Sequence, residues 1–198
     1  MEFAFTDEQG MIADTVRGFF AENASSERTR AAMAGEGMDA GIDRALWTCF
    51  ASELGLAGVG LPEEHGGAGL GMVEFALVAE AAGAHVAALP LLGLAMVGRA
   101  IAAGGSEEQK SEWLPRLGSG DVIAAAGWSE GLQSANGCLT GKLAFVPHGG
   151  VADILLACAG DDAWLVDLKG EGVTITRPVT MDQTRPLASI TLTPATAE

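Results

Sequence analysis

Basic residues are scarce in this chain. Among its 198 residues, 11 are Lys or Arg and 26 are Asp or Glu, which gives a formal net charge of -15 at pH 7. Such a charge repels the phosphate backbone of DNA and RNA, and the sequence has no basic run that would form a nucleic-acid footprint. We therefore expect no nucleic-acid partner.

The sequence also lacks a long uninterrupted apolar run. Residues 76–103 are strongly apolar, but Glu80, His85, Pro90 and Arg99 interrupt them. No window of about 18 apolar residues remains, so we expect two packed helices and no membrane insertion. The first eight residues are acidic where a secretory signal would be basic, which predicts a cytoplasmic protein.

Cysteine and histidine are few, with three of each. Cys49, Cys138 and Cys158 are odd in number and far apart, which indicates reduced thiols rather than a disulfide framework. Neither residue type shows metal-ligand spacing, so we expect no metal site. The glycine-rich residues 66–71 have no strand before them and do not form a dinucleotide-binding fingerprint.

A hydrophobic content of 48% with 19% charged residues is typical of a folded soluble protein. The first 120 residues predict helices. Thr6 and Gln9 have capping-box spacing before a helix over residues 7–23, and Ser106 caps another over 107–117. Apolar periodicity predicts three more helices, over residues 43–54, 72–82 and 91–103, the first with Leu54 on its buried face.

After Gly120 the local composition changes to short runs rich in Val, Ile, Leu and Thr, which predict strands. We expect them over residues 122–128, 138–140, 143–146, 154–158, 163–167, 173–176 and 188–193, with a hairpin turn at residues 160–162. The chain is thus predicted to be α+β. A helical bundle domain over residues 1–120 precedes a small β-barrel or sandwich domain over 121–198.

Three segments carry a resemblance to a known family. They are residues 60–70 (GLPEEHGGAGL), 105–120 (GSEEQKSEWLPRLGSG) and 128–150, which begin WSEG and end GKLAFVPHGG. In this order and at this spacing they resemble the acyl-CoA dehydrogenases. That family has an N-terminal helical domain, a middle β-domain and a C-terminal four-helix domain. The chain resembles the first two, and we expect the third to be absent from it.

The resemblance implies a chemistry. In the family, FAD lies between the middle domain and the C-terminal helices, and a carboxylate of the C-terminal domain removes the α-proton of an acyl-CoA thioester. The β-hydride passes to the flavin, and an electron-transfer flavoprotein later collects the electrons. The resemblance therefore implies FAD, an acyl-CoA substrate and that partner. It assigns no catalytic base to any residue of this chain.

The resemblance also implies flavin contacts in the β-domain. The family's Ala-x-(Ser/Thr)-Glu-Pro pattern matches residues 126–130 and leaves Gly131 in place of Pro. This match implies that Ser129 contacts the flavin. For Trp128 two roles stay open: a core residue, or a contact to the flavin or the substrate. A later family serine, which meets the flavin pyrophosphate, corresponds to Ser134.

The family's Trp-Ile-Thr-Asn element corresponds to residues 145–148. Phe145 is able to stack on the flavin as the family's Trp does, whereas Pro147 has neither a hydroxyl nor a backbone N–H to offer. The segment between Ser134 and Gly141 is also shorter than is usual in the family. His148 is either a flavin-edge residue or an ordinary loop histidine.

Several alternatives stay open. Some family members work as heteromeric pairs in steroid side-chain degradation, and the altered flavin edge resembles their divergent subunit. The resemblance in general implies a homo- or hetero-oligomer with another acyl-CoA dehydrogenase chain. The chain is alternatively a non-catalytic interaction or structural subunit that has lost its own flavin, or a fragment of a longer enzyme. Residues 62–67 suit a polar turn before a helix, and Arg185 suits a phosphate, a carboxylate or a surface salt bridge.

Overall fold

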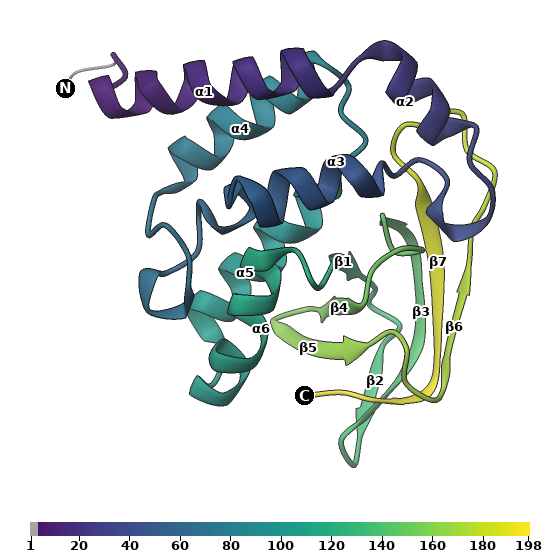
Figure 1. Ribbon diagram of the computed structural model, residues 1–198. Helices are drawn as coiled ribbons and strands as arrows, with labels where there is room; N and C mark the ends of the chain where they lie inside the picture. Colours follow the sequence, from purple (N-terminus) through teal and green to yellow (C-terminus); the bar gives the residue numbers. More distant parts are fainter. Residues whose placement is uncertain (1–3) are drawn as a thin grey trace.

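A computed structural model describes residues 4–198 (Figure 1). The first three residues of the acidic N-terminal segment lie outside this range. In the described part, every α-helix precedes Gly120 and every strand follows Ile123, as the change in sequence texture predicted. The α-helices are α1 (Asp7–Asn23), α2 (Ser26–Met33), α3 (Arg44–Thr48), α4 (Met72–Ala84), α5 (Leu91–Gly104) and α6 (Glu107–Ser119).

The capping box predicted at Thr6 is present, and the cap predicted at Ser106 is a capping box as well. The backbone N–H of Gln9 donates to Thr6 Oγ1 at 3.2 Å, and Ser106 Oγ accepts from the N–H of Gln109 at 3.2 Å. Both satisfy donors that a helix start leaves free. Helix α2 was not predicted, although its N-cap Ser25 has the same chemistry and accepts from the N–H of Arg28.

The helix predicted over residues 43–54 changes character in its second half. Helix α3 continues as a π-helical turn, Cys49–Glu53, where the N–H of Leu54 donates to the carbonyl of Cys49. The wider turn rotates the end of the helix, so Leu54 is 48% exposed and its predicted burial was wrong. Trp47 and Phe50 are buried as expected and stack at 5.8 Å between ring centroids.

Residues 62–67 form the predicted polar turn. A 3-10 helix (Glu63–His65) ends at Gly66, whose φ of 82° is left-handed. A Cβ on Gly67 would lie 2.1 Å from the carbonyl oxygen of Leu61, so this backbone approach requires glycine. The segment then leads into α4, which packs against α1, while α5 packs against α6.

The strands form two sheets. One has the order β1 (Ala124–Trp128), β4 (Ile154–Ala159), β5 (Asp162–Asp167), with β1 parallel to β4. The other has the order β2 (Gln133–Ala135), β3 (Cys138–Pro147), β7 (Leu187–Thr196), β6 (Val173–Thr176) and is antiparallel. The isolated bridge between Val166 and Ala197 joins the two sheets, as expected of a small barrel or sandwich.

Two details of the strands differ from the prediction. Residues 138–147 form one strand with two register shifts rather than two strands. Strand β2 was missed, although Asn136 and Gly137 form the two-residue hairpin turn that joins it to β3, with φ of 52° and 72°. The hairpin predicted at residues 160–162 is present between β4 and β5, with Gly160 at φ 56°.

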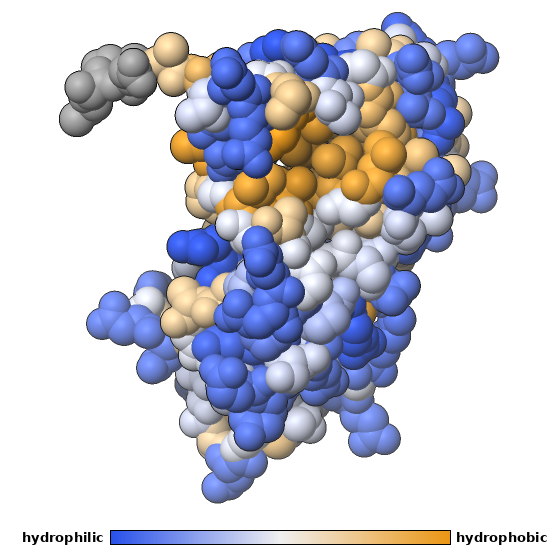
Figure 2. Space-filling model, turned by 60° about the vertical axis from the view of Figure 1, so that its left-hand side comes forward, coloured by the Kyte–Doolittle hydropathy of each residue, from blue (hydrophilic) through white to orange (hydrophobic). Residues whose placement is uncertain are grey.

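The helical and β parts share one hydrophobic core. Helix α5 lies directly on β1, and a Cβ on Gly93 would be only 1.8 Å from the carbonyl oxygen of Ala124. One face of the molecule carries an apolar hollow in its upper part, above a largely hydrophilic region (Figure 2). Helices α4 and α5 keep large apolar side chains exposed, among them Met72, Val73 and Leu92. Within residues 4–198, no helix has both the length and the hydropathy to cross a membrane.

Candidate functional site

The end of strand β1 carries two of the predicted flavin contacts. Trp128 is 57% exposed, so the alternative of a core residue was wrong. Ser129 follows in a turn: its N–H donates to the carbonyl of Cys158, and its Oγ accepts from the N–H of Gly131 at 3.3 Å. Because that oxygen accepts within the chain, its proton is free to donate to a ligand.

Phe145 lies on the neighbouring strand β3, at a bulge. The β3–β7 register shifts between Leu143 and Val146, and Phe145 has a left-handed φ of 57° with 68% of its surface exposed. A left-handed φ is unfavourable for a bulky side chain, and such strain concentrates at functional sites. Strand β1 crosses β3 here, since a Cβ on Gly127 would lie 2.9 Å from Val146 Cγ2. We call Trp128, Ser129 and Phe145 the open edge.

Ser134 lies apart from the open edge. It pairs with Leu139 in the β2–β3 hairpin and is exposed. Leu139 precedes Phe145 by six residues on β3, which corresponds to about 20 Å of strand. The structure therefore does not bring Ser134 together with Phe145 and Pro147.

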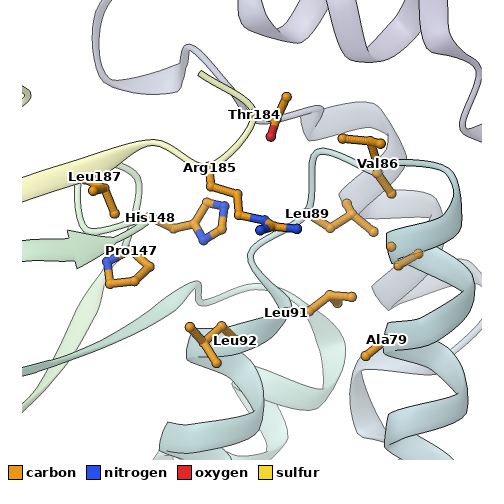
Figure 3. Close-up of a pocket in the computed structure, with 13 residues that line it drawn as sticks. Ala79, Val86, Leu89, Leu91, Leu92, Pro147, His148, Thr184, Arg185 and Leu187 are labelled. Atoms are coloured by element: carbon orange, nitrogen blue, oxygen red, sulfur yellow. The ribbon is translucent and has the colours of Figure 1, made fainter. Parts of the chain in front are cut away.

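Pro147 ends strand β3 and lines a pocket of about 360 Å³ (Figure 3). The pocket lies between helix α4, the α4–α5 connection and the start of α5 on one side, and the ends of β3 and β7 on the other. Its lining is mostly aliphatic. The residues are Ala79, Ala82, Gly83, Val86, Ala87, Leu89, Leu91, Leu92, Pro147, His148, Thr184, Arg185 and Leu187. No Asp or Glu is among them.

His148 is the unusual polar group of this pocket. The residue is only 5% exposed, and neither nitrogen of its ring has a hydrogen-bond partner within the described chain. Burial lowers the pKa of His148 to about 4, with a further contribution from the positive charge of Arg185, so the ring is neutral at pH 7. The prediction of an ordinary loop histidine does not describe this buried residue.

Backbone hydrogen bonds hold His148 in place. Its own φ is left-handed at 55°, its N–H donates to the carbonyl of Pro186 at 2.8 Å, and its carbonyl accepts from the N–H of Val151 at 3.1 Å. Arg185 is exposed and forms no ion pair among residues 4–198, so the predicted surface salt bridge is not seen there.

Sequence reasoning found the open edge and Pro147 but missed the opposite wall of the pocket. Val86, Leu89 and Leu91 lie around the α4–α5 connection, and the sequence prediction noted them only as members of the apolar stretch over residues 76–103. Pro90, which breaks the apolar stretch, is the signal that marks this connection.

The other reactive side chains do not gather into a site. Cys49, Cys138 and Cys158 are half-buried free thiols, as expected. In the part of the chain that the structure describes, no three His, Cys, Asp or Glu side chains are grouped so that they could hold a metal ion.

Residues 6–121, more than half of the chain, match the sequence model of the acyl-CoA dehydrogenase N-terminal domain. The chain belongs to the acyl-CoA dehydrogenase family. It is 31% identical over 185 residues to the acyl-CoA dehydrogenase IpdE2 of Mycolicibacterium smegmatis, an alignment that covers 93% of this chain and 52% of that protein. The chain thus spans about half the length of the curated relatives it matches.

Solved structures share the fold of the whole chain. The ChsE4-ChsE5 complex from Mycobacterium tuberculosis superposes with a TM-score of 0.86 at 26% identity, over 99% of this chain and 56% of the matched one. The Tcur3481-Tcur3483 steroid acyl-CoA dehydrogenase, in its G363A variant, gives 0.80 at 32% identity, over 96% and 56%. Both span the helical and β parts seen here, which matches the predicted fold.

Family members use FAD, and one solved relative holds it. The open edge fits a flavin in part. Trp128 and Phe145 each expose an aromatic ring that is able to stack on a flat ring system, and Ser129 has a free hydroxyl proton. Pro147 does not fit the usual contact, because it has no N–H to donate.

Proposed function

We propose that this chain provides the flavin edge and the acyl pocket of an FAD-dependent acyl-CoA dehydrogenase, an enzyme of α,β-dehydrogenation of acyl-CoA thioesters. The position of Pro147 carries the proposal. It lies two residues after exposed Phe145 on the same strand, and it also lines the apolar pocket. A flat cofactor on the open edge and an acyl chain in the pocket would therefore meet at Pro147.

In this proposal, the residues of the open edge bind and orient the flavin. Phe145 and Trp128 would pack against aromatic rings, and Ser129 would donate a hydrogen bond from its hydroxyl. Ser134, about 20 Å along the hairpin, would contact only a distant part of a long cofactor. FAD bound here would supply the acceptor for the hydride that leaves the β-carbon of the thioester.

The aliphatic wall of the pocket would hold the acyl chain and exclude water from it. Removal of the weakly acidic α-proton also needs a base. No carboxylate lines the pocket, and the family places the base in the C-terminal helical domain, so this proposal assigns the base to that domain. That domain would be supplied in the same polypeptide or by a partner.

Exposed apolar side chains support such an association. Met72 and Val73 on α4 and Leu92 on α5 are each about half exposed, and large exposed apolar patches commonly mark interaction sites. The similarity to the ChsE4-ChsE5 complex supports a hetero-oligomer with another family chain. A steroid-like acyl group, a cytoplasmic location and electron-transfer flavoprotein as electron acceptor belong to the same proposal.

A non-catalytic subunit is the second candidate. Pro147 removes a donor from the flavin edge, and Ser134 is remote from it, both of which favour a chain that binds a dehydrogenase partner without holding flavin itself. The two candidates differ in where flavin contacts lie within the assembly.

The test is to co-express the chain with a family member encoded beside it and to measure flavin absorbance and FAD affinity. Substitutions Phe145→Ala and Ser129→Ala should each weaken FAD binding, while Val179→Ala, at a residue 97% exposed, serves as control. Flavin retained with unchanged affinity in both edge variants would favour the non-catalytic subunit. A colourless reconstituted assembly would contradict the proposed function.

A further inference from the structure

The pocket beside Pro147 has two chemically different sides (Figure 3). Helix α4, the α4–α5 connection and α5 contribute aliphatic side chains such as Val86, Leu89 and Leu91. The opposite side carries the imidazole of His148 and the guanidinium of Arg185, which extends past the imidazole toward Leu89 in the close-up. A plain aliphatic acyl chain would match only the first side.

The second side holds unmet hydrogen-bonding capacity. Both nitrogens of His148 are buried without a partner among residues 4–198, and buried polar groups in native proteins are nearly always paired. Leaving such a group unsatisfied is costly, so a partner is expected when the pocket is filled. Arg185 adds further donors, because no carboxylate within the described chain pairs with it.

The state of the ring restricts the partner. A neutral imidazole carries one N–H donor and one acceptor nitrogen. An oxygen that accepts from the imidazole N–H is also able to accept from a guanidinium N–H, and a carboxylate, ketone or hydroxyl oxygen has the necessary lone pairs. A ligand that is cationic at this end is disfavoured by Arg185.

We infer that this pocket selects acyl groups that carry an acceptor oxygen remote from the thioester, with His148 and Arg185 as the residues that recognise it. This inference rests on the proposed function, because it assigns the acyl group to this pocket. The aliphatic wall would hold the carbon skeleton, and the polar side would hold the oxygen. His148 and Arg185 thereby determine specificity and take no part in the chemistry.

The test compares three CoA thioesters of matched length on the FAD-loaded assembly: hexanoyl-CoA, 6-hydroxyhexanoyl-CoA and adipoyl-CoA. We expect at least one of the two oxygen-bearing thioesters to bind about tenfold tighter than hexanoyl-CoA, as one hydrogen bond to a charged or buried polar group allows. A preference for adipoyl-CoA alone identifies a carboxylate, and a preference for both identifies an acceptor oxygen of either charge.

Variants separate recognition from folding. His148→Phe keeps a ring of similar shape, and Arg185→Gln keeps donors without charge; each should reduce severalfold the ratio of the affinity for the preferred thioester to the affinity for hexanoyl-CoA, both measured on the same variant. Arg17→Gln, an exposed residue of α1 paired with Asp14, removes the same charge elsewhere and should preserve the preference. A ¹⁵N NMR shift of the His148 ring on binding the preferred thioester gives a second readout in the intact assembly.

Two negative results have different meanings. Equal affinity for all three thioesters, with the His148 ring resonances unmoved, would overturn this inference and leave the proposed function standing. Failure of every thioester, hexanoyl-CoA included, to bind the FAD-loaded assembly would overturn the proposed function and this inference with it.

Discussion

The contact between helix α5 and strand β1 leads to a sharp prediction about stability. A Cβ added at Gly93 would lie 1.8 Å from the oxygen and 2.7 Å from the carbon of the Ala124 carbonyl. Ordinary contacts to a Cβ begin near 3.4 Å, so the helix or the strand must move by more than 1 Å. Both atoms belong to the backbone, so no change of side-chain rotamer relieves the clash.

The expected change in the free energy of unfolding for Gly93→Ala is the sum of two opposing contributions. Overpacking a core costs about 1–3 kcal/mol, and the rigid contact places Gly93→Ala at the upper end. Replacing a helical glycine by alanine returns about 1 kcal/mol of helix propensity, so the net loss in the free energy of unfolding is about 2 kcal/mol. The displaced helix also begins at Leu91 and Leu92, which line the pocket, so acyl-CoA affinity should fall as well.

Gly18→Ala is the matched control. Gly18 lies inside α1, and a Cβ there would meet nothing within 4 Å. The same chemical change should therefore stabilise the chain by about 0.5–1 kcal/mol. Urea denaturation followed by tryptophan fluorescence measures both variants, which should differ by about 3 kcal/mol. Equal stability of the two variants would refute the close packing of α5 on β1.

Three further predictions concern the site and the fold. The pKa of His148 is about 4 in the folded chain, below the ordinary value of 6.5, so its contribution to stability is complete above pH 6.5 and is lost as the pH falls toward 4. Between pH 7 and pH 5 this residue should account for about 2 kcal/mol of lost unfolding free energy; His148→Phe should remove that component in urea titrations at the two pH values, and an unchanged pH dependence would contradict the buried neutral ring. Asp43 caps α3 through the N–H of Leu46 at 2.9 Å and accepts two hydrogen bonds of 2.8 Å from Arg28. Asp43→Ala should cost about 2 kcal/mol and Asp43→Asn about 1 kcal/mol in chemical denaturation, because asparagine retains the cap, and the reverse order would be inconsistent with this dual role. Phe145→Gly should stabilise the chain by about 1 kcal/mol by relieving the left-handed backbone, yet weaken FAD binding about tenfold in a fluorescence titration; a loss of stability would disprove the strain.

Local rules recovered most of the fold. Capping residues marked the starts of α1 and α6, and runs rich in Val, Ile, Leu and Thr marked six of the seven strands, because these signals depend on neighbours in sequence. Such rules could not predict the π turn at Cys49–Glu53, because helical periodicity assumes a constant number of residues per turn. The bulge at Phe145 likewise depends on pairing with β7, which lies more than 40 residues later.

The candidate site was predicted less completely than the fold. Resemblance pointed to five residues: Trp128, Ser129, Ser134, Phe145 and Pro147. Trp128, Ser129 and Phe145 lie near one crossing of strands β1 and β3, with Pro147 next along β3, whereas Ser134 lies apart in the β2–β3 hairpin. The pocket needed the structure, because its walls come from α4, α5, β3 and β7. The burial of His148 was equally hidden, since a histidine between proline and glycine normally reads as a surface loop.

The central claim is that the open edge holds FAD beside the acyl pocket of an acyl-CoA dehydrogenase. The most direct measurement is an FAD titration of the assembly formed with a co-expressed family chain, carried out on the unaltered chain and on Phe145→Ala. The account predicts a yellow assembly whose FAD affinity falls about tenfold in the variant, as expected for loss of an aromatic contact. An assembly that stays colourless, or that binds FAD equally well without the Phe145 ring, would contradict it.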